Sequence, residues 1–259
     1  KLGLVIIDEQ HRFGVDQRLA LRNKGNDQFT PHQLVMTATP IPRTLAMSAY
    51  GDLDTSVIDE LPPGRTPIQT VTIPLDRREQ VLQRIATNCR EGKQAYWVCT
   101  LVEQSETLDA QAAEATYQEI KDRFPDVNIG LVHGKMKANE KQAVMQAFKD
   151  NQLQLLIATT VIEVGVDVPN ASIMVIENAE RLGLSQLHQL RGRVGRGATA
   201  SFCALLYKAP LSQNGQERLS ILRESNDGFV IAEKDLKIRG PGELLGTKQT
   251  GDMGFRVVR

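Results

Sequence analysis

Two neighbouring carboxylates near the start of the sequence are the first residues suited to chemistry. Asp8 and Glu9 directly follow the apolar, β-branched run 4–7, which is typical of a parallel strand covered on both faces. Ligands bind beyond the carboxyl ends of such strands, where two acids can hold Mg²⁺ and orient a water molecule. An isolated Asp-Glu pair can also simply cap the next turn. The pair therefore needs support from other segments before it indicates phosphate chemistry.

A cluster of arginines and glycines at 189–197 is the second such group. If the segment is helical, Gln189, Arg193 and Arg196 share one face, at spacings i, i+4 and i+7. Its glycines would each cost such a helix about 1 kcal/mol relative to alanine, so we expect them to permit close approach to a ligand or a facing domain. Guanidinium groups bind phosphate oxygens through paired hydrogen bonds. From this segment alone, phosphate binding and a solvated basic loop both remain open.

Polar residues lie at the ends of three further strand-like runs. Thr37 and Thr39 follow the first of these runs and offer two hydroxyl groups, and Thr159 and Thr160 end another. His133 stands at the end of the third run, where an imidazole or a backbone N–H group could contact a phosphate. A lone histidine is more often structural, so the role of this one depends on its context.

The elements that must position these residues alternate between strand and helix, which predicts an α/β fold with a parallel sheet and helices on both faces. Asp76 and Ser105 are the expected N-caps of two of the helices. The predicted strands are 4–7, 33–36, 54–59, 68–73, 94–101, 127–133, 153–160, 172–178 and 201–207. The predicted helices are 44–50, 77–90, 106–124, 138–149, 212–225 and 228–238.

The segment 61–65, Leu-Pro-Pro-Gly-Arg, is the strongest break in this pattern and marks the expected domain boundary. We expect the end of a first lobe over 1–62, a second lobe over 66–208, and a helical hairpin with a glycine-rich loop over 209–259. The sequence begins with a lysine beside a strand pattern, and it contains no phosphate-binding loop G-x-x-x-x-G-K-S/T. The first lobe is therefore expected to be truncated.

The composition excludes several classes of protein. Lysine plus arginine and aspartate plus glutamate both number 31, so no bulk charge argues for nucleic acid or membrane, and any polyanion contact must come from local clusters. Cys89, Cys99 and Cys203 match neither a zinc spacing nor a disulfide framework. We expect them to be buried thiols in a reducing compartment. No apolar run approaches membrane-spanning length.

Four segments, in the same order, resemble the motifs of superfamily-two helicases. Asp-Glu-Gln-His at 8–11 resembles the motif that coordinates Mg-ATP, and Thr-Ala-Thr at 37–39 resembles the motif that couples hydrolysis to strand movement. The segment 158–169 resembles the motif that contacts nucleic acid and nucleotide, and 189–196 matches the pattern Q-x-x-G-R-x-G-R. The resemblance implies two RecA-like lobes with ATP and Mg²⁺ between them. A non-catalytic DNA-binding module is the alternative from another functional class.

The resemblance also implies roles for individual residues. Arg193 and Arg196 would reach the γ-phosphate from the second lobe, and such arginines are worth roughly 10³ to 10⁵ in rate in phosphoryl-transfer enzymes. Arg191 is the one arginine of the segment left without a catalytic role. The implied catalytic residues are Asp8, which also binds the metal, Glu9, His11, Gln189, Arg193 and Arg196; the nucleotide-binding residues are Gly165 and Asp167; and the DNA-binding residues are Thr37, Thr39, Arg43, His133, Thr159 and Thr160.

The end of the sequence resembles the translocation motif shared by the RecG branch-migration helicases and the transcription-repair coupling factors. A predicted helical hairpin there precedes the glycine-rich loop 239–251, in which Arg239 and Gln249 are implied to convert lobe movement into translocation. The loop could also merely pack the hairpin against the motor. Gln10 and the segment 240–243 favour the RecG family over the coupling factors, which are the alternative within the enzyme class.

Membership of the RecG family would imply an ATP-dependent helicase and double-stranded-DNA translocase. It would remodel stalled replication forks and branch-migrate Holliday junctions in recombination and repair. Its cofactors would be ATP and Mg²⁺, and its partner branched double-stranded DNA, with single-stranded-DNA-binding protein as a further candidate. We expect a monomer in the bacterial cytoplasm, associated with the nucleoid. Because the phosphate-binding loop is missing, the chain alone is expected not to hydrolyse ATP.

Overall fold

The computed structural model describes residues 2–8, 30–37, 54–100, 105–163 and 167–239. They belong to two compact units, Lys1–Ile41 and Pro42–Arg259. The predicted helix 44–50 lies outside the described residues. So do six of the residues to which the resemblance assigns a role: Glu9, His11, Thr39, Arg43, Gly165 and Gln249.

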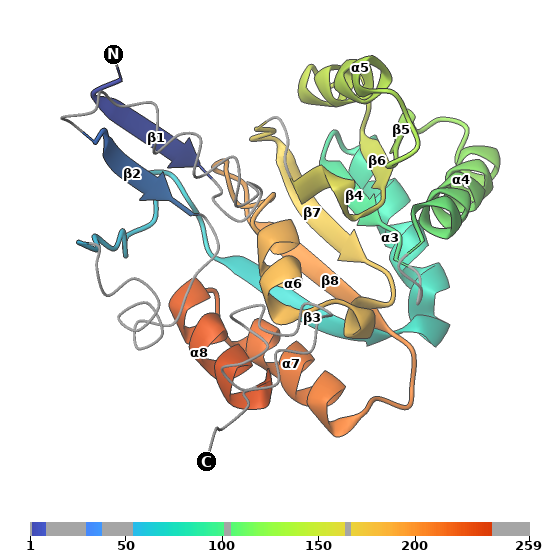
Figure 1. Cartoon of the computed structure of the whole chain (residues 1–259). Coiled ribbons are helices and arrows are strands. Elements are labelled where there is room, and N and C mark those ends of the chain that lie inside the picture. The colour runs from blue at the N-terminus through green and yellow to red at the C-terminus, as the bar shows by residue number, and fades with distance from the viewer. Residues whose placement is uncertain (1, 9–29, 38–53, 101–104, 164–166, 240–259) are drawn as a thin grey trace. The chain divides into compact units, whose positions relative to one another are not determined.

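The first unit contains two parallel strands, β1 (Leu4–Asp8) and β2 (His32–Met36) (Figure 1). Val5 and Ile7 are buried, whereas Leu4 and Ile6 are 54% and 58% exposed. Side chains alternate between the two faces of a strand, so β1 is covered on one face and exposed on the other. The prediction that this strand is covered on both faces is therefore wrong for this chain.

The second unit is built on a parallel sheet whose six strands follow the order β3-β8-β7-β4-β6-β5 (Figure 1). Every residue of the central strands β4 and β7 is buried. This burial explains their continuous apolar sequences, because helices cover both faces of the sheet. The strand bounds are β3 (Ile68–Pro74), β4 (Gln94–Val98), β5 (Ile129–Val132), β6 (Leu155–Ala158), β7 (Ala171–Ile176) and β8 (Ser201–Tyr207).

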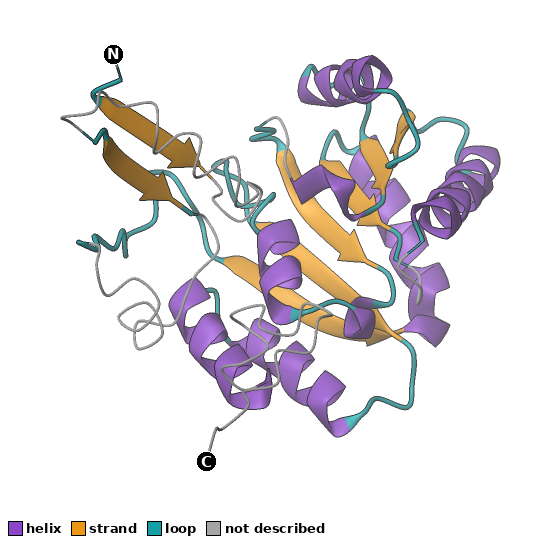
Figure 2. Ribbon diagram, in the orientation of Figure 1, coloured by secondary structure: helices purple, strands orange, loops and turns teal. Residues whose placement is uncertain are grey.

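Helices lie on both sides of this sheet (Figure 2). On one face, α3 (Arg78–Arg90) and α4 (Glu106–Arg123) form a core with Ala95 and Trp97 of β4. On the other, four helices form a second core with Tyr96 and Val98 of the same strand. These helices are α5 (Ala138–Lys149), α6 (Leu184–Arg191), α7 (Gln213–Glu224) and α8 (Gly228–Arg239). Three short 3-10 helices complete the described elements: η2 (Leu75–Arg77), η3 (Thr160–Glu163) and η4 (Ala179–Arg181).

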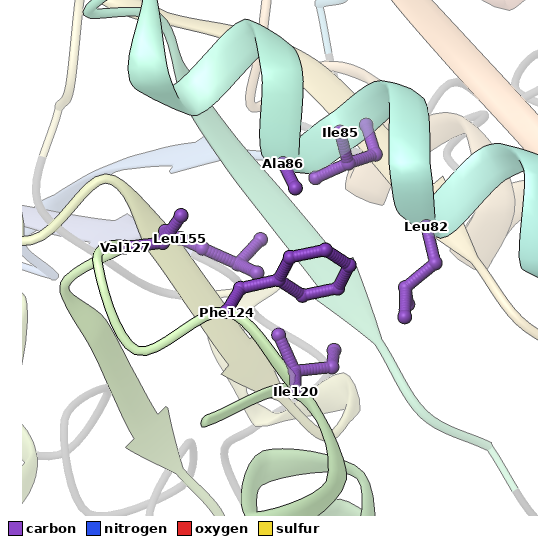
Figure 3. Close-up of a pocket in the computed structure, with 7 residues that line it drawn as sticks. All are labelled: Leu82, Ile85, Ala86, Ile120, Phe124, Val127 and Leu155. Carbon is purple, nitrogen blue, oxygen red and sulfur yellow. The ribbon is translucent and has the colours of Figure 1, made fainter. Parts of the chain in front are cut away.

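A small pocket between α3 and α4 is lined by apolar side chains alone (Figure 3), and the ion pairs Arg78–Glu119 and Glu79–Arg123 join the same two helices outside it. The side chains that face one another in the pocket are Leu82, Ile85, Ala86, Ile120, Phe124, Val127 and Leu155. They carry no group that could bind or polarise a substrate. This part of the core therefore supports the sheet and contributes no chemistry.

The predicted fold class, a parallel sheet with helices on both faces, is confirmed. The Ser105 cap is also confirmed, because its hydroxyl accepts a hydrogen bond from the backbone N–H of Leu108 at 3.4 Å. Asp76 is not a cap: it lies within η2, and Arg77 precedes α3 without a side-chain cap. The predicted strand 54–59 is wrong, because the segment is exposed and pairs with no described strand. The expected domain boundaries stay predictions.

Candidate functional site

A short helix positions the arginine-rich segment. α6 buries Leu184, Leu187 and Leu190, which recur about once per turn, and this apolar face fixes its orientation on the core. The helix ends at Arg191, and Gly192 is its C-cap. Gly192 keeps right-handed helical backbone angles (φ −64°, ψ −8°), so the helix ends there without a left-handed cap.

Residues 192–197 continue as an irregular segment, called the arginine loop below. Gly195 in this loop has φ of +78°, a conformation that L side chains rarely adopt. Gln189 lies within α6, whereas Arg193 and Arg196 lie on the loop. The predicted helical face shared by these three residues is therefore wrong, because α6 ends at Arg191 and the left-handed Gly195 lies between the two arginines.

Two glycines let the arginine loop pack directly against other backbone. A Cβ atom on Gly195 would lie 3.0 Å from the carbonyl oxygen of Thr66 and 2.9 Å from Cγ1 of Ile68. A Cβ atom on Gly197 would overlap the carbonyl group of Pro169. The glycines thus permit close approach to the protein's own backbone. Their approach to a ligand or a facing domain stays a prediction.

Arg196 is held by two acceptors. Its Nε donates to the carbonyl oxygen of Gly192 at 3.1 Å, and its Nη1 donates to Oδ1 of Asp167 at 3.0 Å. The Asp167 side chain is 56% exposed, so water screens this ion pair. The structure thus brings together two residues to which the resemblance assigns separate roles, one at the phosphate and one at the nucleotide. An arginine has five N–H donors, and this arrangement uses two of them.

Arg193 and Arg196 both lie within electrostatic reach of Tyr96 on β4. Burial raises the pKa of Tyr96 to about 12, and the two guanidinium charges act in the opposite direction. The Tyr96 ring packs edge-on against Phe148 of α5, with the ring centroids 5.0 Å apart. The arginine loop therefore lies on the side of the sheet that α5 and α6 cover.

Arg191 is a buried structural residue, only 2% exposed. Its Nη1 donates to the carbonyl oxygen of Leu222 at 2.6 Å and to Oγ1 of Thr70 at 3.2 Å. Its Nη2 lies 3.1 Å from Nδ1 of His188, which must accept because arginine can only donate. Burial, followed by the charge of Arg191, lowers the pKa of His188 to about 4. Arg191 thus ties α6 to β3 and α7.

In the first unit, Asp8 and Thr37 lie at the same edge of the strand pair. Asp8 ends β1 and is paired in register with Met36 of β2, which Thr37 follows. Both residues are exposed. This edge is the carboxyl end of two parallel strands, the usual position of ligand-binding side chains in such sheets. Within the described ranges, no group of three or more His, Cys, Asp or Glu side chains could hold a metal ion.

The predicted DNA-binding residues of the second unit gather at the ends of β5 and β6, which are neighbours in the sheet. Nε2 of His133 lies 3.0 Å from Glu114 of α4, and its Nδ1 accepts a hydrogen bond from the backbone N–H of Lys135. Both ring nitrogens therefore serve the protein's own structure. Thr159 is buried, and its hydroxyl has no hydrogen-bond partner in the described structure, whereas Thr160 is partly exposed at the start of η3.

Arg239 is the last residue of α8 and lies against the start of α6. Its Nε is 3.1 Å from Oδ1 of the buried Asp235, one turn earlier on the same helix. A side chain added at Gly183, the N-cap of α6, would overlap the Arg239 guanidinium. The residue assigned to translocation by resemblance therefore contacts the helix that carries the arginine loop.

Arg65 is a site residue that the sequence did not reveal. Its Nη1 donates to the carbonyl oxygen of Gly192 at 3.2 Å, the same oxygen that binds Arg196. The sequence marks the segment only as a break between domains. An arginine directly after a Pro-Pro-Gly turn was the one available signal, since such a turn holds the next side chain in a fixed direction.

Comparisons with known proteins agree with this architecture. Residues 76–198 match the helicase conserved C-terminal domain, and residues 225–257 match domain 3, C-terminal, of the ATP-dependent DNA helicase RecG. No described helix is long and apolar enough to cross a membrane.

The chain is similar to RecG helicases over almost its whole length. It is 72% identical to ATP-dependent DNA helicase RecG of Escherichia coli strain K12 and 68% identical to that of Haemophilus influenzae, over 99% of this chain. It spans 37% of the length of both relatives. Among solved structures, RecG bound to a three-way DNA junction matches with a TM-score of 0.74 and 46% identity, over 94% of this chain and 31% of that one. Sequence and structure together show that the chain belongs to the RecG helicase family.

Proposed function

We propose that this chain is part of the motor of an ATP-dependent double-stranded-DNA translocase that remodels stalled forks and branch-migrates Holliday junctions. The observation that carries the proposal is the arrangement of Arg196 and Asp167. Residues from two separate helicase-like segments converge there on one glycine-rich loop beside the sheet. The chain covers 37% of its curated relatives, so the activity proposed is that of a longer protein.

In this proposal, Arg193 and Arg196 bind the phosphate that is transferred. Asp167 and the Gly192 carbonyl accept from Nη1 and Nε of Arg196, which holds the planar guanidinium in one orientation. We assign Nη2 to the phosphate. Charge that develops on the phosphate during transfer would then meet a donor that is already oriented, the most effective form of electrostatic catalysis.

The proposed metal ligand is Asp8. Its exposed carboxylate lies on the last residue of β1, and a hard oxygen ligand of this kind suits Mg²⁺. The ion would neutralise charge on the nucleotide phosphates. We assign Glu9 to orienting the attacking water, and His11 and Gln189 to sensing the state of the nucleotide. Gly165 is assigned, with Asp167, to nucleotide binding.

The proposed DNA contacts are to the backbone, because hydroxyl, amide and guanidinium donors of this kind bind phosphate oxygens. His133 would act by fixing the turn at Lys135, since both of its ring nitrogens are already bonded. Arg239 and Gln249 are assigned to coupling movement to translocation. The remaining assigned contacts are Thr37, Thr39, Arg43, Thr159 and Thr160. Single-stranded-DNA-binding protein as a partner, a monomeric state and a place at the nucleoid complete the proposal.

The test is Arg196→Ala in the full-length protein that carries this chain. We expect DNA-stimulated ATP hydrolysis to fall about 10³-fold, with the affinity for branched DNA nearly unchanged. Arg84→Ala is the matched control, because Arg84 is exposed on α3 and remote in sequence from every proposed site residue. An unchanged rate in Arg196→Ala would sink the catalytic assignment. A wild-type protein without ATPase activity would instead favour a non-catalytic DNA-binding module.

A further inference from the structure

The segment that leads into β3 is fastened to the arginine loop at two points. Residues 61–66, called the connector below, follow the exposed segment 54–60. Arg65 donates from Nη1 to the carbonyl oxygen of Gly192 at 3.2 Å, and the backbone N–H of Thr66 donates to the carbonyl oxygen of Gly195 at 3.2 Å. The two hydrogen bonds therefore hold the arginine loop at its first residue, Gly192, and at Gly195.

A tight turn in the connector fixes the position of Arg65. The backbone N–H of Arg65 donates to the carbonyl oxygen of Pro62 at 3.2 Å, which closes a four-residue turn. Pro63 fixes φ at its first central position, and Gly64 occupies the second with φ of +84°, as a type II turn requires. Such a turn has few alternative conformations. The direction of the Arg65 side chain is therefore set by its own backbone.

Arg65 and Arg196 share one acceptor. Both guanidinium groups donate to the carbonyl oxygen of Gly192, so two positive charges are drawn to the same point. Burial lowers the pKa of Arg65, the charge of Arg196 lowers it further, and Asp167 acts in the opposite direction. The positions of the two arginines therefore depend on each other, because both lie beside the Gly192 carbonyl oxygen and the Asp167 carboxylate. A displacement of either arginine changes the balance of forces on the other.

We propose that Arg65 is a positioning residue for Arg196, and that the connector transmits movement of the chain before β3 to the arginine loop. The inference rests on the proposed function, because it needs Arg196 to act on phosphate. Arg65 itself touches neither substrate nor metal in this proposal. When the connector is bonded to Gly192 and Gly195, the arginine loop holds Arg196 in the orientation that binds phosphate. When the connector moves away, the loop loses both hydrogen bonds.

The first experiment compares Arg65→Ala with Arg84→Ala in the full-length protein, at saturating branched DNA. We expect Arg65→Ala to lower kcat for ATP hydrolysis about tenfold, because misplacement of a catalytic group by about 1 Å can cost up to about 10²-fold and Asp167 still holds Arg196. KM for ATP and the affinity for DNA should change less than about twofold. Arg84→Ala should match wild type.

A double variant shows whether Arg65 acts through Arg196. If it does, adding Arg65→Ala to Arg196→Ala should cause no further loss of kcat, because the group being positioned is already gone. A further tenfold loss in the double variant would overturn the inference, since Arg65 would then act independently. Loss of DNA affinity in Arg65→Ala, with a weaker salt dependence of binding, would overturn it as well and make Arg65 a DNA contact.

Two glycines provide a matched test that leaves every side chain of the site in place. Gly64 and Gly92 both have positive φ, +84° and +88°, and a Cβ on either would meet no atom within 4 Å. Alanine at either position therefore strains the backbone similarly, but only Gly64 lies in the turn that delivers Arg65. We expect Gly64→Ala to lower kcat severalfold and Gly92→Ala to leave it unchanged. Equal effects of the two substitutions would refute a specific role for the connector.

The outcomes separate this inference from the proposed function. If Arg196→Ala does not reduce ATP hydrolysis, the proposed function itself fails. If Arg196→Ala abolishes hydrolysis while Arg65→Ala and Gly64→Ala behave like their controls, the proposed function stands and the coupling through the connector is wrong.

Discussion

Replacing Arg191 with alanine should destabilise the second unit strongly, although Arg191 belongs to the same sequence segment as the two proposed catalytic arginines. Its guanidinium is buried among α6, β3 and α7 and donates to Leu222, Thr70 and His188. The carbonyl of Leu222 is one of the last four of α7, which have no partner within the helix. Arg191 therefore also places positive charge at the negative end of the α7 dipole.

The magnitude follows from these contacts. Hydrogen bonds from a charged donor are worth about 1.5–3 kcal/mol each, and a buried carbonyl left without a donor costs about 1–3 kcal/mol. Removing a buried charge offsets part of this loss, because the desolvation of that charge is no longer required. We expect Arg191→Ala to reduce the free energy of unfolding by about 3 kcal/mol. Arg191→Met, which keeps the packing of the side-chain stem, should cost about half as much.

Urea unfolding followed by tryptophan fluorescence measures this effect on the relevant unit. Trp97 is the only tryptophan of the chain and is fully buried in β4 of the same sheet. At a slope of about 3 kcal/mol per molar urea, the midpoint for Arg191→Ala should fall by about 1 M. Arg84→Ala, an exposed substitution, should shift it by less than about 0.2 M. A shift for Arg191→Ala no larger than for Arg84→Ala would refute the structural role.

Two further predictions concern protonation. The pKa of His188 is about 4 in the folded chain, against 6.5 for an unperturbed histidine, so between these values only the unfolded chain binds the proton. Stability should fall as pH drops from about 6.5 to 4, by up to about 1.4 kcal/mol per pH unit, and urea titrations of His188→Gln should lack this slope. Burial raises the pKa of Cys89, Cys99 and Cys203 to about 12. A thiol reagent at pH 8 should therefore label them only as fast as the chain unfolds, and rapid labelling of folded protein would contradict their burial.

The sequence was most informative where local pattern and tertiary packing agree. The strand Ser201–Tyr207 and the helix Ala138–Lys149 have the bounds expected from the sequence, because their apolar residues are spaced to match the faces they bury. The three cysteines are free and buried, as predicted. The predicted family is also correct, since motif order depends on chemistry that a sequence displays directly.

The sequence misled where tertiary contacts override a local pattern. Gln189, Arg193 and Arg196 have helical spacing, but the helix ends at Arg191, and Gly195 beyond it packs close to the Thr66 carbonyl. Nothing in the spacing of the arginines encodes that neighbour.

Contacts between segments that are distant in the sequence could not be predicted either. Arg65 and Gly192 are 127 residues apart, and no periodicity links them. His133 has the local sequence of a phosphate contact, yet its imidazole is bonded to Glu114 on a helix that precedes its strand. In both cases the polar group that the sequence presents is satisfied by a partner that only the fold supplies.

The strand order has a consequence for how the motor is assembled during synthesis. β8, the last of the six described strands of its sheet to be made, lies between β3, the first of them, and β7. Until the ribosome has released Ser201–Tyr207, β3 has no partner and β7 exposes an unpaired edge. Such long-range parallel pairing is slow and leaves nascent chains prone to aggregation. Because the connector leads directly into β3, the arginine loop gains its support in this same final step, so a chain stopped short of β8 should lack an ordered Arg196 as well as a complete sheet.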